Sequence, residues 1–369
     1  ETGYRANKTY DGSTSTSGVT FGNSSVVGAN GLPNEVSVTL NNPTLTYNSK
    51  NFNNNSKTMT ADSAYTISSA THSRHGTVYG LSAGTQSISN VRISKKPVSL
   101  TGSKTYDGTT AASSSALSVN SGLVGSETLV LSGSGTLNTA NAGTNSITSN
   151  ASGVSLGDGS NGGLAANYTL TGGTHQMTVG QRGVILSGSR LYDSTSTASS
   201  SDLSTITGTV GNETLNLTGS GTLGNANVGS NKSITLGSIA LADGSNGGLA
   251  ANYSLSSGTL TVNQRPLTAT LARQYDGTTT ATGSTLSSLS GLQGGQTLSL
   301  TGSGTIASKN VGNSKSVTLG SIALADGTGA ASNYSLSSAA MNVTKRPIII
   351  SGSRHYKGNT RVLSSDLKK

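Results

Sequence analysis

The feature that most constrains the fold of this chain is a short motif that recurs five times. Tyr-Asp-Gly occupies residues 10–12, 106–108 and 275–277, and the variants Tyr-Asp-Ser and Tyr-Lys-Gly occupy residues 192–194 and 356–358. The copies are 96, 86, 83 and 81 residues apart. Self-similarity at a nearly fixed spacing is typical of tandem structural repeats. The motif, called the anchor below, therefore predicts four related repeats and the start of a fifth.

Three further blocks keep the same order after the anchor. One is GSGTL or GSGTI, beginning at Gly133, Gly219 and Gly302; another is ETLVL, ETLNL or QTLSL, beginning at Glu127, Glu213 and Gln296; the third begins with Asn-Tyr at Asn167, Asn252 and Asn333. The repeats differ in length within a run of Gly, Asn and Ser, where insertions and deletions in surface turns cost little. The predicted boundaries give a diverged first repeat, 1–95, three similar repeats, 96–182, 183–264 and 265–345, and the start of a fifth, 346–369.

The hydrophobic pattern within a repeat predicts strands. In the third repeat the apolar pairs two residues apart are Val184/Leu186, Leu215/Leu217, Ile234/Leu236, Ile239/Leu241, Tyr253/Leu255 and Leu260/Val262. Turn sequences such as Asp-Gly and Asn-Gly-Gly separate them, and no long helical period is present. Only 32% of residues are hydrophobic, which favours thin cores. We therefore expect an all-β chain, a tandem array of small antiparallel β-sandwiches of Ig-like or β-grasp-like type.

The junctions between repeats are short, and most contain a basic residue followed by proline. Lys96-Pro97, Arg265-Pro266 and Arg346-Pro347 lead directly into the next repeat, while Arg182 is followed by Gly183. Proline fixes its own φ and biases the preceding residue to an extended backbone. We expect neighbouring repeats to be held end to end in an elongated rod. With about 30–40 Å per repeat, four would span on the order of 130–160 Å.

The run KTYDGTTA at residues 104–111, with the later Asn-Tyr block and the basic-Pro junction, resembles the YDG repeats of large bacterial filamentous-haemagglutinin-like adhesins. The resemblance implies a secreted or cell-surface adhesin, often exported by a two-partner system, in which these repeats form a stalk. It implies no catalytic residue. The first repeat departs from the pattern after its anchor.

Composition limits the classes of partner. The chain has no Cys, which excludes disulfides and Cys-ligated metals, and no run of 18 apolar residues, so we expect no membrane insertion. The net charge is +9, but the basic residues are scattered and aromatics are scarce, which argues against nucleic acid. We expect a monomer that requires no cofactor and whose contacts are with adjacent repeats of its parent chain.

Several residues have a chemical alternative to a structural role. Asp107, Asp193 and Asp276 in the anchors can be ligands, but an Asp-Gly turn explains them more simply. The Asp-Gly-Ser-Asn-Gly-Gly runs at Asp158 and Asp243 resemble a calcium loop with too few carboxylates. Glu127 and Glu213 are candidate acids for a Lys–Asn crosslink, although the fourth repeat has Gln296 there. The four His lack zinc or triad spacing. We expect no enzyme and no metal site.

The first repeat is the candidate for direct ligand binding. It is the longest repeat and contains both Phe, five of the twelve Tyr and two of the four His. Exposed aromatics beside arginine are typical of binding surfaces. The residues that we expect to contact a host-cell or matrix glycan or protein are Tyr47, Tyr65, Tyr79, His72, Arg74 and His75. The alternative is that these aromatics fill the core of a diverged repeat.

Overall fold

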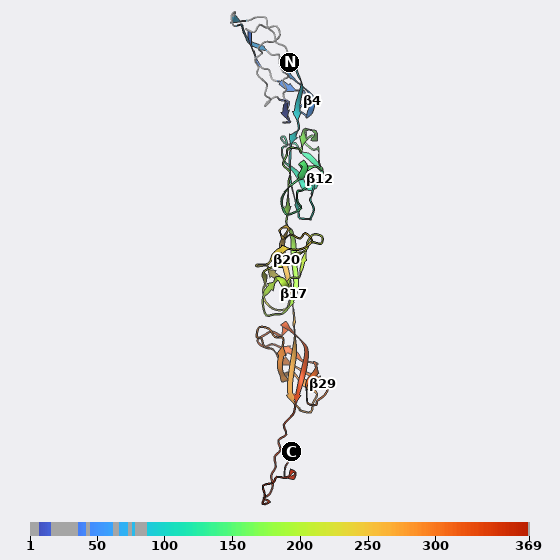
Figure 1. The fold of residues 1–369 in the computed structure, drawn as a ribbon, viewed down its shortest axis with the longest axis vertical. Coiled ribbons are helices and arrows are strands. Elements are labelled where there is room, and N and C mark those ends of the chain that lie inside the picture. The colour runs from blue at the N-terminus through green and yellow to red at the C-terminus, as the bar shows by residue number, and fades with distance from the viewer. Residues whose placement is uncertain are drawn as a thin grey trace. The chain divides into compact units, whose positions relative to one another are not determined.

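The computed structural model describes residues 7–15, 36–41, 45–61, 66–72, 76–77 and 87–367. The chain divides into two units, Glu1–Arg182 and Gly183–Lys369. The elements of each unit are strands with a few one-turn helices, coloured along the chain in Figure 1. Among the described residues no helix is long and apolar enough to cross a membrane. The predicted all-β tandem array is confirmed.

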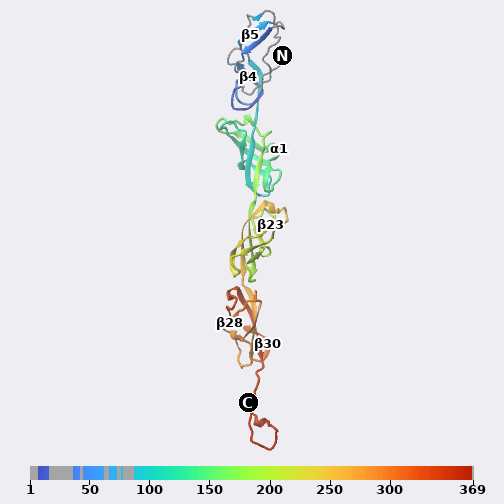
Figure 2. The same ribbon diagram turned by 90° about the vertical axis from the view of Figure 1, so that its left-hand side faces the viewer.

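Unit 1 contains the first and second repeats. The strands of the first repeat are β1 (Asn7–Thr9), β2 (Val36–Asn41), β3 (Leu45–Tyr47), β4 (Asn53–Ala61), β5 (Thr66–His72), β6 (Gly76–Thr77) and β7 (Ser87–Ser94). The elements of the second are β8 (Lys96–Pro97), β9 (Ser99–Thr105), β10 (Ala111–Ser113), η1 (Ser114–Ala116), β11 (Leu117–Ser121), β12 (Leu129–Thr136), β13 (Gly143–Ser146), α1 (Thr148–Ala151), β14 (Val154–Asp158), η2 (Ala165–Asn167), β15 (Tyr168–Thr169) and β16 (Gln176–Gly180). The second repeat, with the turn α1, is seen from the side in Figure 2.

Unit 2 contains the third and fourth repeats. The elements of the third are β17 (Arg182–Leu191), β18 (Thr197–Ser199), η3 (Ser200–Asp202), β19 (Thr205–Thr207), β20 (Leu215–Thr218), β21 (Ser220–Leu223), β22 (Gly229–Thr235), β23 (Ala240–Asp243), η4 (Ala250–Asn252) and β24 (Tyr253–Asn263). Those of the fourth are β25 (Arg265–Gln274), β26 (Thr280–Thr282), η5 (Gly283–Thr285), β27 (Leu286–Ser290), β28 (Ser299–Thr301), β29 (Ser303–Ile306), β30 (Gly312–Thr318), β31 (Ala323–Ala325), η6 (Ala331–Asn333) and β32 (Tyr334–Thr344). Among the described residues after Pro347, the one helix or strand is the one-turn helix η7 (Ser364–Asp366).

The sheets are mixed, and this corrects the expectation of purely antiparallel sandwiches. In the fourth repeat one sheet has the order β26-β29-β30-β32-β25-β27 and a second has β28-β31. The first and last long strands, β25 and β32, pair in parallel, as β9 and β16 do in the second repeat. The other pairings of the fourth repeat are antiparallel.

The parallel pairing has a simple geometric cause and a consequence for the junctions. Arg265 lies beside Tyr334 at one end of the β25–β32 pair, and Gln274 lies beside Thr344 at the other. The chain thus enters the repeat at one end and leaves at the opposite end, so its first and last strands run in the same direction. The anchor that follows β25 lies at the exit end, and the Asn-Tyr block lies at the entry end.

The hydrophobic cores cross the junctions inside each unit. A cluster of the fourth repeat contains Leu271, Ile306 and Met341. A second cluster joins Leu186 and Leu260 of the third repeat to Leu298 of the fourth. In unit 1 a cluster likewise includes side chains of both repeats: Tyr10, Met59, Ile93, Val98 and Tyr168. Neighbouring repeats of a unit therefore share buried apolar surface.

Candidate functional site

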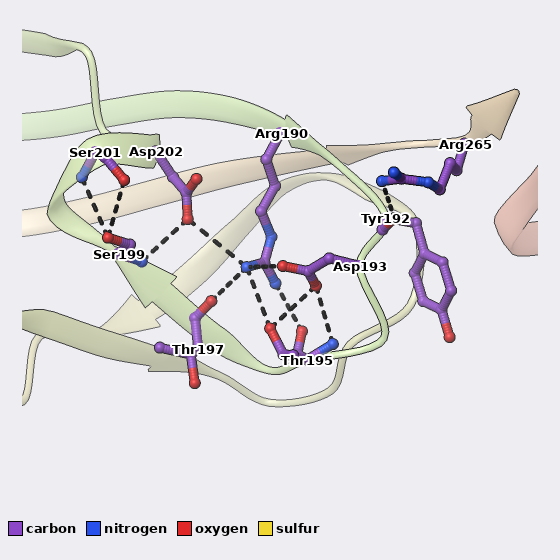
Figure 3. A network of polar contacts seen from close by, with 9 residues as sticks. All are labelled: Arg190, Tyr192, Asp193, Thr195, Thr197, Ser199, Ser201, Asp202 and Arg265. Atoms are coloured by element: carbon purple, nitrogen blue, oxygen red, sulfur yellow. Dashed lines mark hydrogen bonds and ion pairs between the residues drawn. The ribbon is translucent and has the colours of Figure 1, made fainter. Parts of the chain in front are cut away.

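The anchor is a loop folded around a positively charged side chain of the same repeat. Two residues before Tyr192, Arg190 donates to Asp193 Oδ2 at 2.9 Å and to the carbonyl oxygens of Thr195 at 2.6 Å and Thr197 at 2.5 Å. The other Asp193 oxygen accepts from the Thr195 backbone N–H at 2.9 Å. Figure 3 shows this network, with the Tyr192 ring pointing away from it. The loop thus fixes the direction of the tyrosine.

The same contacts recur with lysine in place of arginine. Lys104 donates to Asp107 Oδ1 at 2.9 Å, to the Thr109 carbonyl at 2.7 Å and to the Ala111 carbonyl at 3.0 Å. Thr109 N–H closes the turn on Asp107 at 2.9 Å. Although burial acts to raise the pKa of Asp107, the hydrogen bonds from Lys104 and Thr109 outweigh it and lower the pKa below its ordinary value. The first repeat repeats this arrangement with Lys8 and Asp11.

These contacts give the anchor aspartates a structural role. The loop oxygens that could coordinate a metal ion already accept hydrogen bonds from the chain's own basic side chain, as those of Asp107, Thr109 and Ala111 do from Lys104. In the described parts of the chain no three His, Asp or Glu side chains lie close enough to share a metal ion. Asp158 and Asp243 each accept from a backbone N–H, of Ala165 and Ala250, at 2.7 Å. Their carboxylates fasten the turn that precedes the Asn-Tyr block.

The anchor tyrosine of one repeat meets the Asn-Tyr block of the next. In unit 1 the rings of Tyr10 and Tyr168 form an edge-to-face pair with centroids 5.4 Å apart. Both hydroxyls donate to Glu127, Tyr10 at 2.8 Å and Tyr168 at 2.6 Å. Tyr168 also accepts from the Val124 N–H at 3.1 Å. The buried carboxylate thus joins residues from both repeats.

Burial and this carboxylate change the acidity of the two phenols. Burial first, and then the hydrogen bond to Glu127, raise the pKa of Tyr10 to about 12. The same two causes raise the pKa of Tyr168 still further above its ordinary value. Both hydroxyls are therefore protonated donors at neutral pH.

Unit 2 has the same junction with an amide in place of the acid. Tyr192 and Tyr334 pair edge to face at 5.2 Å. Tyr334 donates to Gln296 Oε1 at 2.7 Å, and Gln296 Nε2 donates to the Tyr192 hydroxyl at 2.9 Å. Arg265, the basic residue of the junction, donates to the Tyr192 carbonyl at 3.3 Å. A neutral side chain with one donor and one acceptor therefore satisfies the same pair of hydroxyls.

Within each unit, a buried asparagine holds the junction at a second point. Asn333 Oδ1 accepts from the Val228 N–H at 2.9 Å, and its Nδ2 donates to Asn227 Oδ1 at 3.0 Å. In unit 1 Asn167 accepts from the Phe52 N–H at 2.7 Å and donates to Asn51 at 3.2 Å. The asparagine side chain hydrogen-bonds to one donor and one acceptor of the preceding repeat. These two bonds attach its own repeat to the preceding one and also fix the position of one relative to the other.

The residues proposed for ligand binding in the first repeat are not assembled into a described site. Tyr47 is 2% exposed, packed in the core near Lys8, whose ammonium lies 5.0 Å from the ring centroid. The expectation of a surface role is therefore wrong for Tyr47. His72 is the last residue of β5, but its side chain is outside the described part. Tyr65, Arg74, His75 and Tyr79 lie outside the described residues altogether.

The sequence carries a signal for the junction. Asn167 and Asn333 mark equivalent positions of two repeats, and Glu127 is a candidate acid for a crosslink. Instead, the Glu127 carboxylate accepts from two tyrosine hydroxyls. The useful signal is that the Glu/Gln position and the Asn-Tyr pair both recur in step with the anchor tyrosine. The contacts of Glu127 with Tyr168 and of Gln296 with Tyr334 lie within one repeat, whereas those with Tyr10 and Tyr192 cross to the preceding repeat.

Comparison with known proteins agrees with the repeat structure. The family model described as YDG domain matches residues 93–178, 176–261 and 259–341, three tandem copies that together cover more than half of the chain. No curated protein and no solved structure matches the chain significantly.

Proposed function

The chain belongs to the YDG domain family, and from this premise we propose that it is a non-enzymatic stalk segment of a bacterial adhesin, secreted or displayed at the cell surface. In this role the repeats hold a binding region away from the cell. The resemblance of residues 104–111 and of the junctions to adhesin repeats supports the class of protein.

The junction is the observation that carries the mechanical part of the proposal. In unit 2 a single residue, Gln264, separates the last strand of one repeat from the first strand of the next. Bending there would separate the Tyr192–Tyr334 pair and break the contacts of Asn333. An aromatic pair contributes about 0.5–1.5 kcal/mol beyond burial, and leaving a buried polar group unpaired costs about 1–3 kcal/mol. Such a junction resists bending more than a flexible linker does.

The partners follow from the same role. The repeats contact adjacent repeats of the same parent chain, and the stalk is a monomer without a cofactor. A host-cell or matrix glycan or protein is the class of ligand expected for the binding region that the stalk carries. Nucleic acid and membrane insertion are not part of the proposal.

The stalk role can be tested by lengthening the chain. A second copy of residues 183–264, inserted after Gln264, should raise the maximum dimension from small-angle scattering by roughly 30–40 Å while the cross-section stays constant. The control carries the same insertion with Tyr192→Ala in both copies, which keeps the mass but weakens the junctions and should broaden the distance distribution. A particle that grows in cross-section instead of length would overturn the stalk proposal.

A further inference from the structure

The exit end of the fourth repeat carries an unfilled cavity beside its anchor tyrosine. The cavity has a volume of about 490 Å³ and is lined by Tyr275, Val311, Lys345, Arg346, Pro347 and Ile348. Tyr275 is only half-buried, and Val311 is 48% exposed. An exposed apolar surface of this kind, next to a buried core, needs an explanation.

The corresponding surface of the third repeat explains it. The spacing of 83 residues between the two anchors places Tyr275 at the position of Tyr192 and Val311 at that of Val228. In the third repeat Tyr192 is 3% exposed because the fourth repeat covers it with Tyr334 and Gln296. The cavity of the fourth repeat is thus equivalent to the surface with which the third repeat binds the fourth.

The hydrogen-bonding groups of this surface are repeated as well. Asn310 and Val311 correspond to Asn227 and Val228, whose amide oxygen and backbone N–H bind Asn333. Within the described part of the chain, no residue accepts a hydrogen bond from the Val311 N–H. The surface therefore offers an apolar slot flanked by one donor and one acceptor, which matches a carboxamide followed by a tyrosine ring.

The segment after the fourth repeat indicates where the occupant comes from. Ile348 and Ile350 align with Val184 and Leu186, which are fully buried in the third repeat, yet they are 65% and 57% exposed. Arg354 holds its loop as Arg190 does, donating to the carbonyl oxygen of Arg361 at 2.5 Å. The segment equivalent to the first strand of a repeat thus begins at the cavity and continues into an anchor-like loop, but in the described residues it does not form a strand and no last strand pairs with it.

We propose that the exit end of the fourth repeat, defined by Tyr275, Asn310, Val311 and Arg346, is a docking surface for the Asn-Tyr block of a fifth YDG repeat, the one begun by residues 346–367. The occupant supplies an asparagine for Val311 and Asn310, a tyrosine ring for Tyr275, and a Glu or Gln side chain between the two hydroxyls. The inference concerns how repeats join, and it holds whether or not the array serves as a stalk.

The test completes the fifth repeat on the full chain. Leu367 aligns with Leu203, so the chain is extended from Leu367 by a copy of its own residues 204–264. In hydrogen-exchange measurements the Val311 amide should then exchange at least tenfold more slowly than in the unextended chain. The matched control carries Asn252→Ala and Tyr253→Ala in the appended copy only, and should return Val311 to its original rate. The Val228 amide serves as the internal reference for an occupied junction.

A second extension guards against a failure of the first to fold. Leu286 of the fourth repeat also aligns with Leu367, so a copy of residues 287–345 supplies Gln296, Asn333 and Tyr334 instead. If Val311 exchanges equally fast in folded extended chains with and without the Asn-Tyr block, the docking proposal is wrong. Protection that depends on protein concentration would assign the surface to a second chain and would equally overturn the proposal.

Discussion

At the scale of single residues, the third position of the anchor shows why glycine predominates there. Its φ is positive in each of the five copies, at Gly12, Gly108, Ser194, Gly277 and Gly358. Ser194 adopts φ 67°, a conformation that costs a residue with a Cβ about 1–2 kcal/mol. We predict that Ser194→Gly stabilises unit 2 by about 1 kcal/mol, measured by urea unfolding. Ser201→Gly, at an exposed position in η3, is the control and should destabilise or leave stability unchanged.

Glu127 and Gln296 occupy the same position in two junctions, so the effects of an acid and an amide at this position can be compared. Gln296 shows that one acceptor and one donor satisfy both tyrosine hydroxyls. Glu127→Gln should therefore change the free energy of unfolding of unit 1 by less than about 1 kcal/mol. Glu127→Ala leaves two buried hydroxyls without this partner and should cost on the order of 2–4 kcal/mol. Equal losses in the two variants would contradict the proposed hydrogen bonding.

The same site predicts how unit 1 responds to alkali. A tyrosine hydroxyl ordinarily titrates near pH 10, and in the folded protein the pKa of Tyr10 is raised to about 12. Because the folded state holds this proton more tightly, the stabilisation is complete below about pH 10 and is lost as the pH rises toward 12. Absorbance at about 295 nm should show late titration of Tyr10. Glu127→Gln removes the acidic neighbour, so the titration should move toward lower pH. An unchanged titration would mean that burial alone sets the pKa.

Only part of this chemistry was accessible from the sequence. The scarcity of aromatics in thin cores predicts that the anchor residues Tyr106, Tyr192 and Tyr275 are largely buried. This is confirmed for Tyr106 and Tyr192, whereas Tyr275 is only half-buried. The sequence does not predict which residue a tyrosine packs against, because Tyr192 and Tyr334 are 142 positions apart and belong to different repeats. A period indicates that residues are equivalent, but not which repeat supplies the partner. The expectation that Tyr47 is exposed is wrong for a related reason: composition alone does not tell whether an aromatic of a diverged repeat lies in the core or on the surface.

At the scale of elements, the one-turn helix η6 positions the Asn-Tyr block. Asp326 Oδ1 accepts from the Ala331 N–H at 2.7 Å and fixes the start of the turn that ends at Asn333. Asp326→Ala removes this acceptor and should cost about 1–2 kcal/mol, as loss of a helix cap does. Hydrogen exchange at Val228 should accelerate, because Asn333 is less well placed. Asp326→Asn keeps an oxygen acceptor and should restore slow exchange; if it does not, the carboxylate acts through its charge.

Most strand positions follow from the sequence, although Leu236 and Ile239 lie just outside β22 and β23, whereas strand pairing does not follow from it. Alternating apolar residues such as Val184/Leu186 and Leu215/Leu217 do lie in β17 and β20. The parallel pairing of β25 with β32 depends on where the chain must leave the repeat, since the next repeat begins one residue later. Alternation reports which face of a strand is buried, but carries no information on the direction of its neighbour.

At the scale of the molecule, the shared core predicts that neighbouring repeats of a unit unfold together. The cluster containing Leu186 and Leu260 of the third repeat also contains Tyr334 of the fourth, with Tyr192 between them. Nearest-neighbour interfaces of this kind couple the stability of adjacent repeats. Tyr192→Ala should lower the unfolding free energy of unit 2 by about 3–5 kcal/mol and separate its hydrogen-exchange protection into two steps. Tyr275→Ala truncates an equivalent ring that is only half-buried, so it should cost clearly less and leave the coupling intact. Equal losses at the two positions, or a single cooperative transition in Tyr192→Ala, would show that the tyrosine pair does not couple the repeats.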